Sequence, residues 1–570
     1  MLEVAAGRLS SRRRGRSWLL SLGVLAVLAW LFTGYYRMAL TVPTTADGAG
    51  NAVQAFDLFH GNPLLHGWTV SDVSFYGVEL FQFAAIEGVL GLSPQVAPAS
   101  AALSYTLIVL LVGLLAKGSA TGVAARVRIG VALGVVLVPQ PGLGQAIVLG
   151  GPDHTGAAVP LLLAWLLLDR AGRDQAEAEA TREPAARGWV RPRWLPYALG
   201  AVLTWGQLAD PVLSLVGAVP LTVVCLLRTL RRRAWRGPDV ALALAGAGSV
   251  PVSYGALWLI GHLGGYRTQA VPTGLVSWGQ LASHLRTAVE SVTVLFGCHF
   301  PELHGWFERS LGAVHLIGVG LAVIAVARTV RLAWRGAGRR VEQVIAAGIL
   351  VNLAAFVVSA LNTDLLASHE IVPVLPLAAV LVARALFSPI RSKNPGPAWL
   401  PAARWLVPAV RIAALTSAGL LLAAFAGQLN RPAARPSGAA VADWLASQHL
   451  HYGLGGYWVA NNITVDSGGT VQVAPLNGIS RITGYRWESR RDWYDPAQHD
   501  ARFIVLQLNS PGFFTVDVAI AQFGQPVARR TLPTSGSGSA TVLVYDRNLL
   551  LGLPAWCAPG REAPSMAQCR

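Results

Sequence analysis

Residues 47–79 read DGAGNAVQAFDLFHGNPLLHGWTVSDVSFYGVE, and the rest of the chain is organised around this stretch. It follows the first long apolar run of the sequence and contains no lysine or arginine. Its carboxylates and histidines are mixed with aromatic residues, a composition that a purely solvated loop does not need. The stretch therefore predicts an acidic loop that lies against a membrane surface, where aromatic side chains collect.

The first part of this stretch has helical spacing. Asp47, Asn51, Gln54 and Leu58 recur at intervals of three or four residues, so they share one face of a helix. Two interpretations stay open from these residues. Asp47 is either a functional carboxylate at the exit of the first apolar run or the N-cap of an amphipathic surface helix.

The chain is too apolar for a soluble protein of its length. Of 570 residues, 53% are hydrophobic and only 13% are charged, and the mean hydropathy is +0.48. Long apolar runs predict a polytopic α-helical membrane protein with about eleven transmembrane helices. The runs lie near residues 18–36, 101–116, 129–149, 157–168, 195–209, 211–227, 240–261, 311–327, 344–361, 371–387 and 405–426.

The net charge of +16 follows from topology. Arginines gather in alternate loops, for example at residues 12–16, 231–236 and 335–340. By the positive-inside rule these loops are cytoplasmic, which makes the protein a multi-pass cell-membrane protein with a cytoplasmic N-terminus. The same placement of charge argues against nucleic acid as a partner.

The sequence divides into a transmembrane domain at 1–427, a linker at 428–437 and an extracytoplasmic domain at 438–570. The last of these is predicted to be a small α/β domain, because a helical pattern at 439–450 precedes several β-rich runs. Those runs are residues 456–460, 470–475, 502–508, 514–522 and 540–546. Since disulfides are allowed outside the cell, a Cys557–Cys569 bridge is a further expectation.

Two more groups of polar residues occupy predicted outer loops. The turn at 150–156 carries Asp153 and His154, either as functional groups or as a polar Gly/Pro turn. Asp210 precedes a proline, which favours an ordinary turn. The loop at 362–370 ends in His369 and Glu370, just before a proline-containing run.

Convergence of these groups with the first loop would create one outer site. Carboxylates and an imidazole suit a divalent cation, Mg²⁺ or Mn²⁺, for which we expect Asp153, His154 and Asp57 as ligands. A separate carboxylate, Asp47, would serve as general base. Acceptor or sugar binding is expected from polar and aromatic residues of the first loop. These are Asn51, Gln54, Asp72, Trp68 and Tyr76.

Two aromatic segments of the C-terminal domain are open to two interpretations. Residues 457–462 and 485–488 combine tyrosine and tryptophan with polar side chains. They either hold a sugar by stacking and hydrogen bonding or form the core and rim of a small domain.

The outer loops resemble the GT-C superfamily of integral-membrane glycosyltransferases, in particular its polyprenyl-phosphate-sugar-dependent mannosyltransferases. Asp47, Asn51 and Ala55, followed by Gly61-Asn62, match the superfamily's acidic helix and turn after the first span. Gly151-Pro-Asp153-His154 is similar to the second acidic motif of oligosaccharyltransferase catalytic subunits. His369-Glu370 stands where the superfamily contacts the donor phosphate, although arginine is common there.

The resemblance implies a polyprenyl-phosphate-linked sugar as donor, an extracytoplasmic acceptor and transfer with inversion. The peptide-recognition motif of true oligosaccharyltransferases is not evident in the C-terminal domain, which argues against transfer to asparagine. A transporter or flippase of lipid-linked sugars without transferase activity is the alternative, and a scaffolding protein with separate acidic loops is the third possibility.

The predicted topology can be tested by labelling. A cysteine introduced at Ser535 should react with a membrane-impermeant thiol reagent on intact cells, because residues 438–570 are expected outside. Protection of this cysteine on intact cells, with labelling only after permeabilisation, would reverse the assignment of every outer loop.

Overall fold

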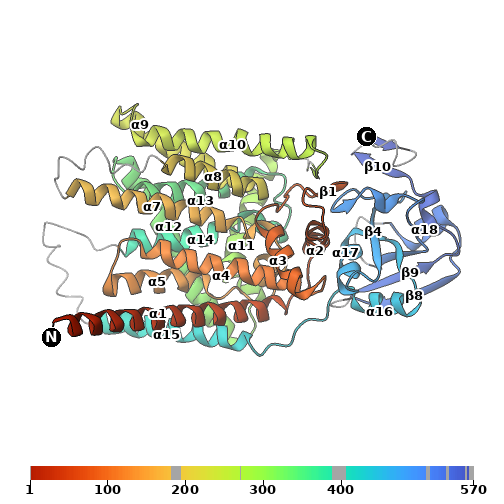
Figure 1. Ribbon diagram of the computed structural model, residues 1–570, viewed down its shortest axis with the longest axis horizontal. Coiled ribbons are helices and arrows are strands. Elements are labelled where there is room, and N and C mark those ends of the chain that lie inside the picture. The colour runs from red at the N-terminus through yellow and green to blue at the C-terminus, as the bar shows by residue number, and fades with distance from the viewer. Residues whose placement is uncertain are drawn as a thin grey trace.

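The computed structural model describes residues 2–180, 194–269, 271, 273–387, 406–508, 514–534, 538–558 and 561–563. A helical bundle forms most of the molecule, and an α/β domain adjoins one end of it (Figure 1). The N-terminus lies at the opposite end of the bundle (Figure 1). Ser535 and Cys569 fall outside the described residues, so the labelling position and the expected disulfide stay predictions.

Long helices run roughly parallel through the bundle (Figure 1). They form because apolar runs in a membrane must satisfy their backbone polar groups within one segment. Their bounds are α1 Leu2–Ala39, α4 Val96–Lys117, α5 Gly122–Val136, α6 Leu143–Leu149, α7 Ala158–Ala180, α8 Leu195–Ala209, α9 Val219–Arg232, α10 Pro238–His262, α12 Gly305–Trp334, α13 Arg340–Val358, α14 Val374–Leu386 and α15 Leu406–Gln428.

Among the described helices, 6 are long and apolar enough to cross a membrane. The number rises to 7 if the segments Leu143–Leu149 and Asp153–Ala171, bent by 59°, count as one span. The predicted fold class, a polytopic helical membrane protein with a C-terminal α/β domain, is confirmed. The count of about eleven spans stays a prediction, because α8 and α14 are short and the run expected at 129–149 is divided between α5 and α6.

The predicted helix of the first loop is α2, Ala46–Phe59. Its N-cap is Thr45, whose hydroxyl accepts a hydrogen bond from the Gly48 amide at 3.0 Å, so the interpretation of Asp47 as N-cap is wrong. The Thr45 amide in turn donates to the Gly150 carbonyl at 3.2 Å. A Cβ at Gly151 would lie 2.4 Å from the Thr45 hydroxyl oxygen, so only glycine permits this approach. The start of α2 is thereby fixed beside the second acidic turn.

Short elements near the end of the bundle complete the loops. The 3₁₀ helices η1 (Asp153–Thr155) and η6 (Leu366–Ile371) hold the second and third polar groups. The remaining elements are α3 Glu79–Leu90, the π-helix η3 Ser214–Ala218, η4 Trp278–Gln280, α11 Leu281–Leu295 and η5 Phe300–Glu302.

The C-terminal domain is built on an 8-stranded mixed sheet with the order β11-β10-β5-β4-β3-β7-β9-β8. Its strands are β3 Tyr452–Gly456, β4 Gln472–Asn477, β5 Thr483–Gly484, β7 Phe503–Leu508, β8 Ala528–Pro533, β9 Ser539–Val544, β10 Ala555–Ala558 and β11 Arg561–Ala563. Its helices are α16 Ala439–Ser447, α17 Tyr457–Asp466, η8 Asp492–Tyr494, α18 Val516–Phe523 and η9 Leu549–Gly552.

Two of the predicted strands are helices. Residues 456–460 and 514–522 fall largely in α17 and α18. The reason for α17 is topological, because β3 and β4 pair in parallel and two parallel strands need a crossover connection between them. Short apolar runs do not distinguish a buried strand from a buried helix by periodicity alone.

A second, small sheet joins the two parts of the molecule. Strand β1 (Trp68–Val70) of the first loop pairs in parallel with β2 (Arg267–Thr268) and antiparallel with β6 (Ser489–Arg490) of the C-terminal domain. Backbone hydrogen bonds thus hold the α/β domain on the loop that carries α2.

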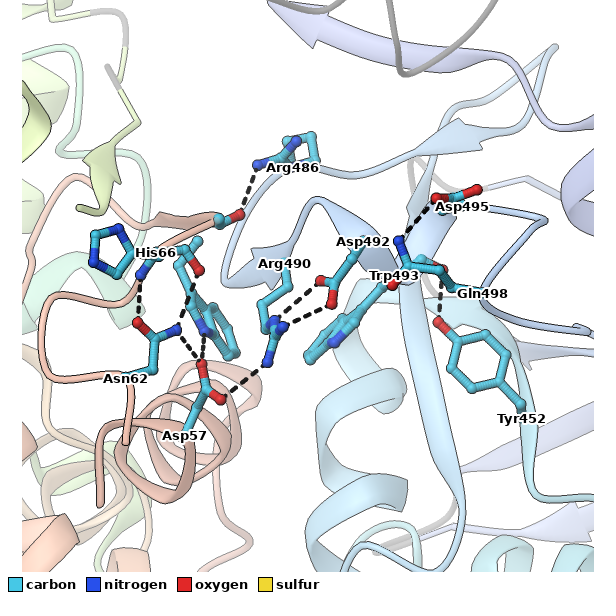
Figure 2. A network of polar contacts seen from close by, with 12 residues as sticks. Asp57, Asn62, His66, Tyr452, Arg486, Arg490, Asp492, Trp493, Asp495 and Gln498 are labelled. Carbon is cyan, nitrogen blue, oxygen red and sulfur yellow. Dashed lines mark hydrogen bonds and ion pairs between the residues drawn. The ribbon is translucent and has the colours of Figure 1, made fainter. Parts of the chain in front are cut away.

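A polar network beside this sheet strengthens the junction (Figure 2). Nη1 of Arg490 donates to Asp57 at 2.9 Å, and Nη2 donates to Asp492 at 2.7 Å. The other oxygen of Asp57 accepts from Nε1 of Trp68 and Nδ2 of Asn62, both at 2.7 Å. The expectations that Asp57 binds a metal and that Trp68 binds a sugar are therefore not retained, since Asp57 neutralises Arg490 and Trp68 is only 2% exposed.

The Arg490 network predicts a measurable contribution to docking of the C-terminal domain. Arg490→Met keeps the apolar stem but removes the donors, and we expect a loss of about 1 kcal/mol, since the pair is partly exposed. Proteolysis at residues 428–437 should become faster and thermal unfolding should begin earlier. Arg502→Met, which breaks a half-exposed pair with Asp500 in the same domain, is the matched control. Equal behaviour of the two variants would contradict a docking role.

Candidate active site

Acids and histidines from separate segments gather at the end of the bundle that faces the α/β domain. Asp47 comes from α2 and lies within electrostatic range of Asp153, His369 and Asp72. Asp72 in turn lies within electrostatic range of His154, Glu370 and Asp210. The members are Asp47, Asp72, Asp153, His154, Asp210, His369 and Glu370, which we call the acidic cluster. The three loops singled out in the sequence therefore converge.

His154 is the centre of the hydrogen bonding in the acidic cluster. Its Nδ1 lies 2.7 Å from Oδ2 of Asp210, and its Nε2 lies 3.2 Å from Oε2 of Glu370. The other oxygen of Asp210 accepts from the Val212 amide at 2.9 Å, which fixes the carboxylate at the end of α8. Asp210 is 1% exposed, so it is a buried partner of His154 and more than a turn residue.

His369 has a similar arrangement at the other carboxylate oxygen of Glu370. Its Nδ1 lies 2.8 Å from the Leu366 carbonyl oxygen, and its Nε2 lies 3.7 Å from Oε1 of Glu370. A carbonyl only accepts hydrogen bonds, so Nδ1 carries the proton and Nε2 faces the carboxylate. The rings of His154 and His369 stack with their centres 5.7 Å apart.

Burial perturbs the acidity of Asp47. Removal of the half-buried carboxyl from water raises its pKa to about 6, and the nearby Asp153 charge acts in the same direction. A hydrogen bond from Tyr457 and the proximity of His369 oppose this rise. A carboxyl with this pKa is largely ionised at neutral pH but more basic than an ordinary aspartate.

The α/β domain closes over Asp47. The hydroxyl of Tyr457 donates to Oδ1 of Asp47 and also lies 3.1 Å from Oε2 of Glu488. A Cβ on Gly50 would lie 2.0 Å from that oxygen of Glu488, so the glycine of α2 makes room for the carboxyl. Nδ2 of Asn51 donates to the Asp47 carbonyl at 2.9 Å and lies 3.5 Å from Glu488.

The residues expected to bind acceptor or sugar have different positions. Asn51 and Gln54 are buried at 0% and 1% exposure, and Nε2 of Gln54 donates to the Gly50 carbonyl within α2. The half-buried Tyr76 donates its hydroxyl to the Pro63 carbonyl at 2.7 Å. Only Asp72 is both exposed and part of the acidic cluster. It is the one member of this predicted set that keeps a free approach to a substrate.

Three residues of the site were not assigned to it from the sequence. Asp210 stands before a proline, a pattern that favours a turn, but a carboxylate at the end of an apolar helix is also a signal for a functional group. Tyr457 and Glu488 lie in the two aromatic segments of the C-terminal domain. Nothing in their local pattern indicates that they meet Asp47, because the contact depends on how the domain docks.

Comparison with known proteins gives distant structural similarities. No protein-family model and no curated protein match the chain. In fold, the chain is similar to ArnT from Cupriavidus metallidurans, with a TM-score of 0.49 and 14% identity over 93% of this chain and 98% of that chain.

A second similarity is to the oligosaccharyltransferase of Archaeoglobus fulgidus with a tethered acceptor peptide. It has a TM-score of 0.44 and 12% identity over 86% of this chain and 69% of that chain. These similarities concern the fold, and the function has to be inferred from the site itself.

Proposed function

We propose that this protein is a membrane glycosyltransferase that moves a sugar from a polyprenyl-phosphate donor to an extracytoplasmic acceptor with inversion. The observation that carries the proposal is the convergence of Asp47, the Asp153-His154 turn and the His369-Glu370 pair at one end of an apolar helical bundle. A scaffolding protein has no need to bring such charges together. The sequence resemblance to the GT-C superfamily supports the same class of reaction.

Asp47 is the proposed general base. As the acceptor oxygen attacks the anomeric carbon, its hydroxyl proton passes to the Asp47 carboxylate. The bond between that carbon and the phosphate oxygen breaks on the opposite face, and its electron pair stays on the phosphate. A base whose pKa lies near the working pH combines ionisation with proton affinity, which suits this role.

The donor phosphate is an anion, and the acidic cluster would repel it. No lysine or arginine in the described part of the chain forms an ion pair with Asp47, Asp153 or Glu370. The histidines alone do not balance the carboxylates. This imbalance supports the expectation of a divalent cation.

The residues present fit such a cation at His154, His369 and Glu370. Ligand atoms of these three side chains lie within 4.8 Å of one another. Each histidine donates from Nδ1 to an oxygen acceptor, which leaves Nε2 directed at the Glu370 carboxylate. An unprotonated Nε2 facing a carboxylate is unfavourable unless a proton or a metal ion lies between them.

This set differs from the expected one of Asp153, His154 and Asp57. His154 belongs to both sets of ligands. Asp57 instead forms an ion pair with Arg490, and Asp153 lies within electrostatic range of His154, His369 and Glu370 without being one of the three ligands. Glu370 fits a metal better than a phosphate, because a carboxylate repels an anion. Two imidazoles and one carboxylate favour Mn²⁺ or Zn²⁺ over Mg²⁺. When bound, the ion would neutralise charge that develops on the leaving phosphate.

The role of Asp47 predicts a loss of catalysis without a loss of binding. Asp47→Asn should reduce transfer from polyprenyl-phosphate-linked sugars by roughly a hundredfold or more, since it removes the proton acceptor. In the unmodified protein kcat should fall below about pH 6, because the protonated carboxyl cannot accept a proton. Activity against a panel of such donors in proteoliposomes gives the measurement. Near-normal transfer by folded Asp47→Asn protein would remove Asp47 from the mechanism, and movement of lipid-linked sugar without any transfer would favour the flippase.

The metal proposal predicts binding that can be measured without turnover. Purified protein should bind about one Mn²⁺ or Zn²⁺ per chain, and His154→Ala or His369→Ala should weaken binding at least tenfold. His66→Ala is the control, because His66 contacts the Gly264 carbonyl outside the acidic cluster. Titration calorimetry and elemental analysis report the occupancy. Unchanged metal content in both cluster variants would leave the histidines as hydrogen-bonding groups only.

A further inference from the structure

The C-terminal domain brings two side chains to the proposed base through separate elements. Tyr457 begins α17, which packs against α2. Glu488 immediately precedes β6, and the pairing of β6 with β1 holds it over Gly50. Glu488 has a φ of +49°, a left-handed conformation that a non-glycine residue adopts at a cost. The docked domain therefore fixes a conformation that an isolated loop would rarely populate.

Counting protons determines the direction of these hydrogen bonds. The Tyr457 hydroxyl has one hydrogen, yet it contacts a carboxyl oxygen of Asp47 and one of Glu488. It cannot donate to both. When Tyr457 donates to an ionised Asp47, the remaining contact is satisfied only if Glu488 is protonated and donates to the tyrosine oxygen. The order is then Glu488, Tyr457, Asp47, with each hydroxyl donating to the next group.

We propose that the α/β domain completes the active site, with Tyr457 and a neutral Glu488 as positioning residues that hold Asp47 for proton transfer. The proposal rests on the proposed function, because it concerns the base of that reaction. The hydrogen bonds from Glu488 to Tyr457 and from Tyr457 to Asp47 restrain Oδ1 of Asp47. Oδ2 has no hydrogen-bond partner among the described residues, so it can accept the proton of an acceptor hydroxyl. Nδ2 of Asn51 donates to the backbone carbonyl of Asp47 at 2.9 Å, which restrains the backbone of Asp47 as well.

The surroundings of Glu488 agree with a neutral carboxyl. Complete burial raises its pKa well above the usual range, and the nearby Asp47 charge raises it further. The charges of Asp153 and Asp72 add to the rise. A hydrogen bond donated by Tyr457 to Glu488 would lower this pKa, but the single hydroxyl proton of Tyr457 is donated to Asp47. A buried carboxylic acid that stays protonated at neutral pH can act as a hydrogen-bond donor.

The test compares isosteric and truncating variants of full-length protein. Tyr457→Phe removes the hydroxyl, Glu488→Gln keeps a donor in the same place, and Glu488→Ala removes it. Tyr452→Phe is the matched control, since Tyr452 is a tyrosine of the same domain whose hydroxyl donates to the Trp493 carbonyl at 2.6 Å. Asp47→Asn is measured in parallel. For each variant, kcat and the donor KM are determined with polyprenyl-phosphate-linked sugars, and thermal unfolding is recorded.

We expect Tyr457→Phe and Glu488→Ala to lower kcat roughly 10- to 100-fold with little change in KM. Each substitution removes a hydrogen bond from the series Glu488–Tyr457–Asp47 that orients the base. Glu488→Gln should keep at least about half of the kcat, and Tyr452→Phe should be normal. In Tyr457→Phe the fall of kcat on acidification should begin at a higher pH. The lost hydrogen bond lowers the pKa of Asp47 in the unmodified protein, so its removal raises that pKa.

The outcomes separate this inference from the proposed function. If Asp47→Asn is inactive while Tyr457→Phe and Glu488→Ala are normal, Asp47 remains the proposed base. The positioning role of Tyr457 and Glu488 is then wrong. If Asp47→Asn transfers sugar normally, the proposed function of Asp47 fails first. A Glu488→Gln variant as impaired as Glu488→Ala would show that Glu488 acts as a carboxylate. Equal losses of thermal stability in every variant and in Tyr452→Phe would reduce Tyr457 to a packing role.

Discussion

The acidic cluster depends on the 2.7 Å contact between His154 and Asp210. Asp210 is the C-cap of α8 and His154 lies in η1, so this contact joins the end of a bundle helix to the second polar turn. A buried carboxylate without a cation or donor is costly. His154 removes that cost and in the same geometry directs its other nitrogen to Glu370 on η6. One imidazole thus aligns three segments that are far apart in the chain.

The second constraint is the junction between the helical bundle and the α/β domain. The first loop contributes α2 to the site and β1 to the small sheet, so a single segment determines both the position of Asp47 and the position of the docked domain. Arg490 and Asp57 stabilise this junction from the side (Figure 2). Trp68 and Asp57, which were expected to bind sugar and metal, form part of this junction instead. An aromatic and acidic composition near a membrane therefore indicates docking as readily as it indicates binding.

The sequence predicts the local features of this protein well and the long-range contacts poorly. The helix of residues 46–59 follows from apolar and polar spacing, and the predicted strands at 470–475, 502–508 and 540–546 correspond to β4, β7 and β9. The N-cap of this helix, in contrast, is Thr45, which lies two residues before Asp47, the N-cap considered from the sequence. The contacts of Asp47 with Tyr457 and of Asp57 with Arg490 cross more than 400 positions of sequence, and no local rule of spacing connects them.

The location of the site at the junction has a physical consequence for catalysis. In the proposed reaction, a polyprenyl donor would have its tail in the bilayer and a hydrophilic acceptor would arrive from water, so both would meet where the apolar helices end. At that boundary a base on the helical part alone would be solvated and would keep an ordinary pKa near 4. Burial is the largest cause of the raised pKa of Asp47, and the α/β domain covers one side of this residue with Tyr457. The same domain supplies the hydroxyl that keeps the carboxylate oriented. Desolvation raises the pKa of Asp47 and the Tyr457 hydrogen bond limits that rise, so in the proposed mechanism the docked domain helps to set the basicity of Asp47.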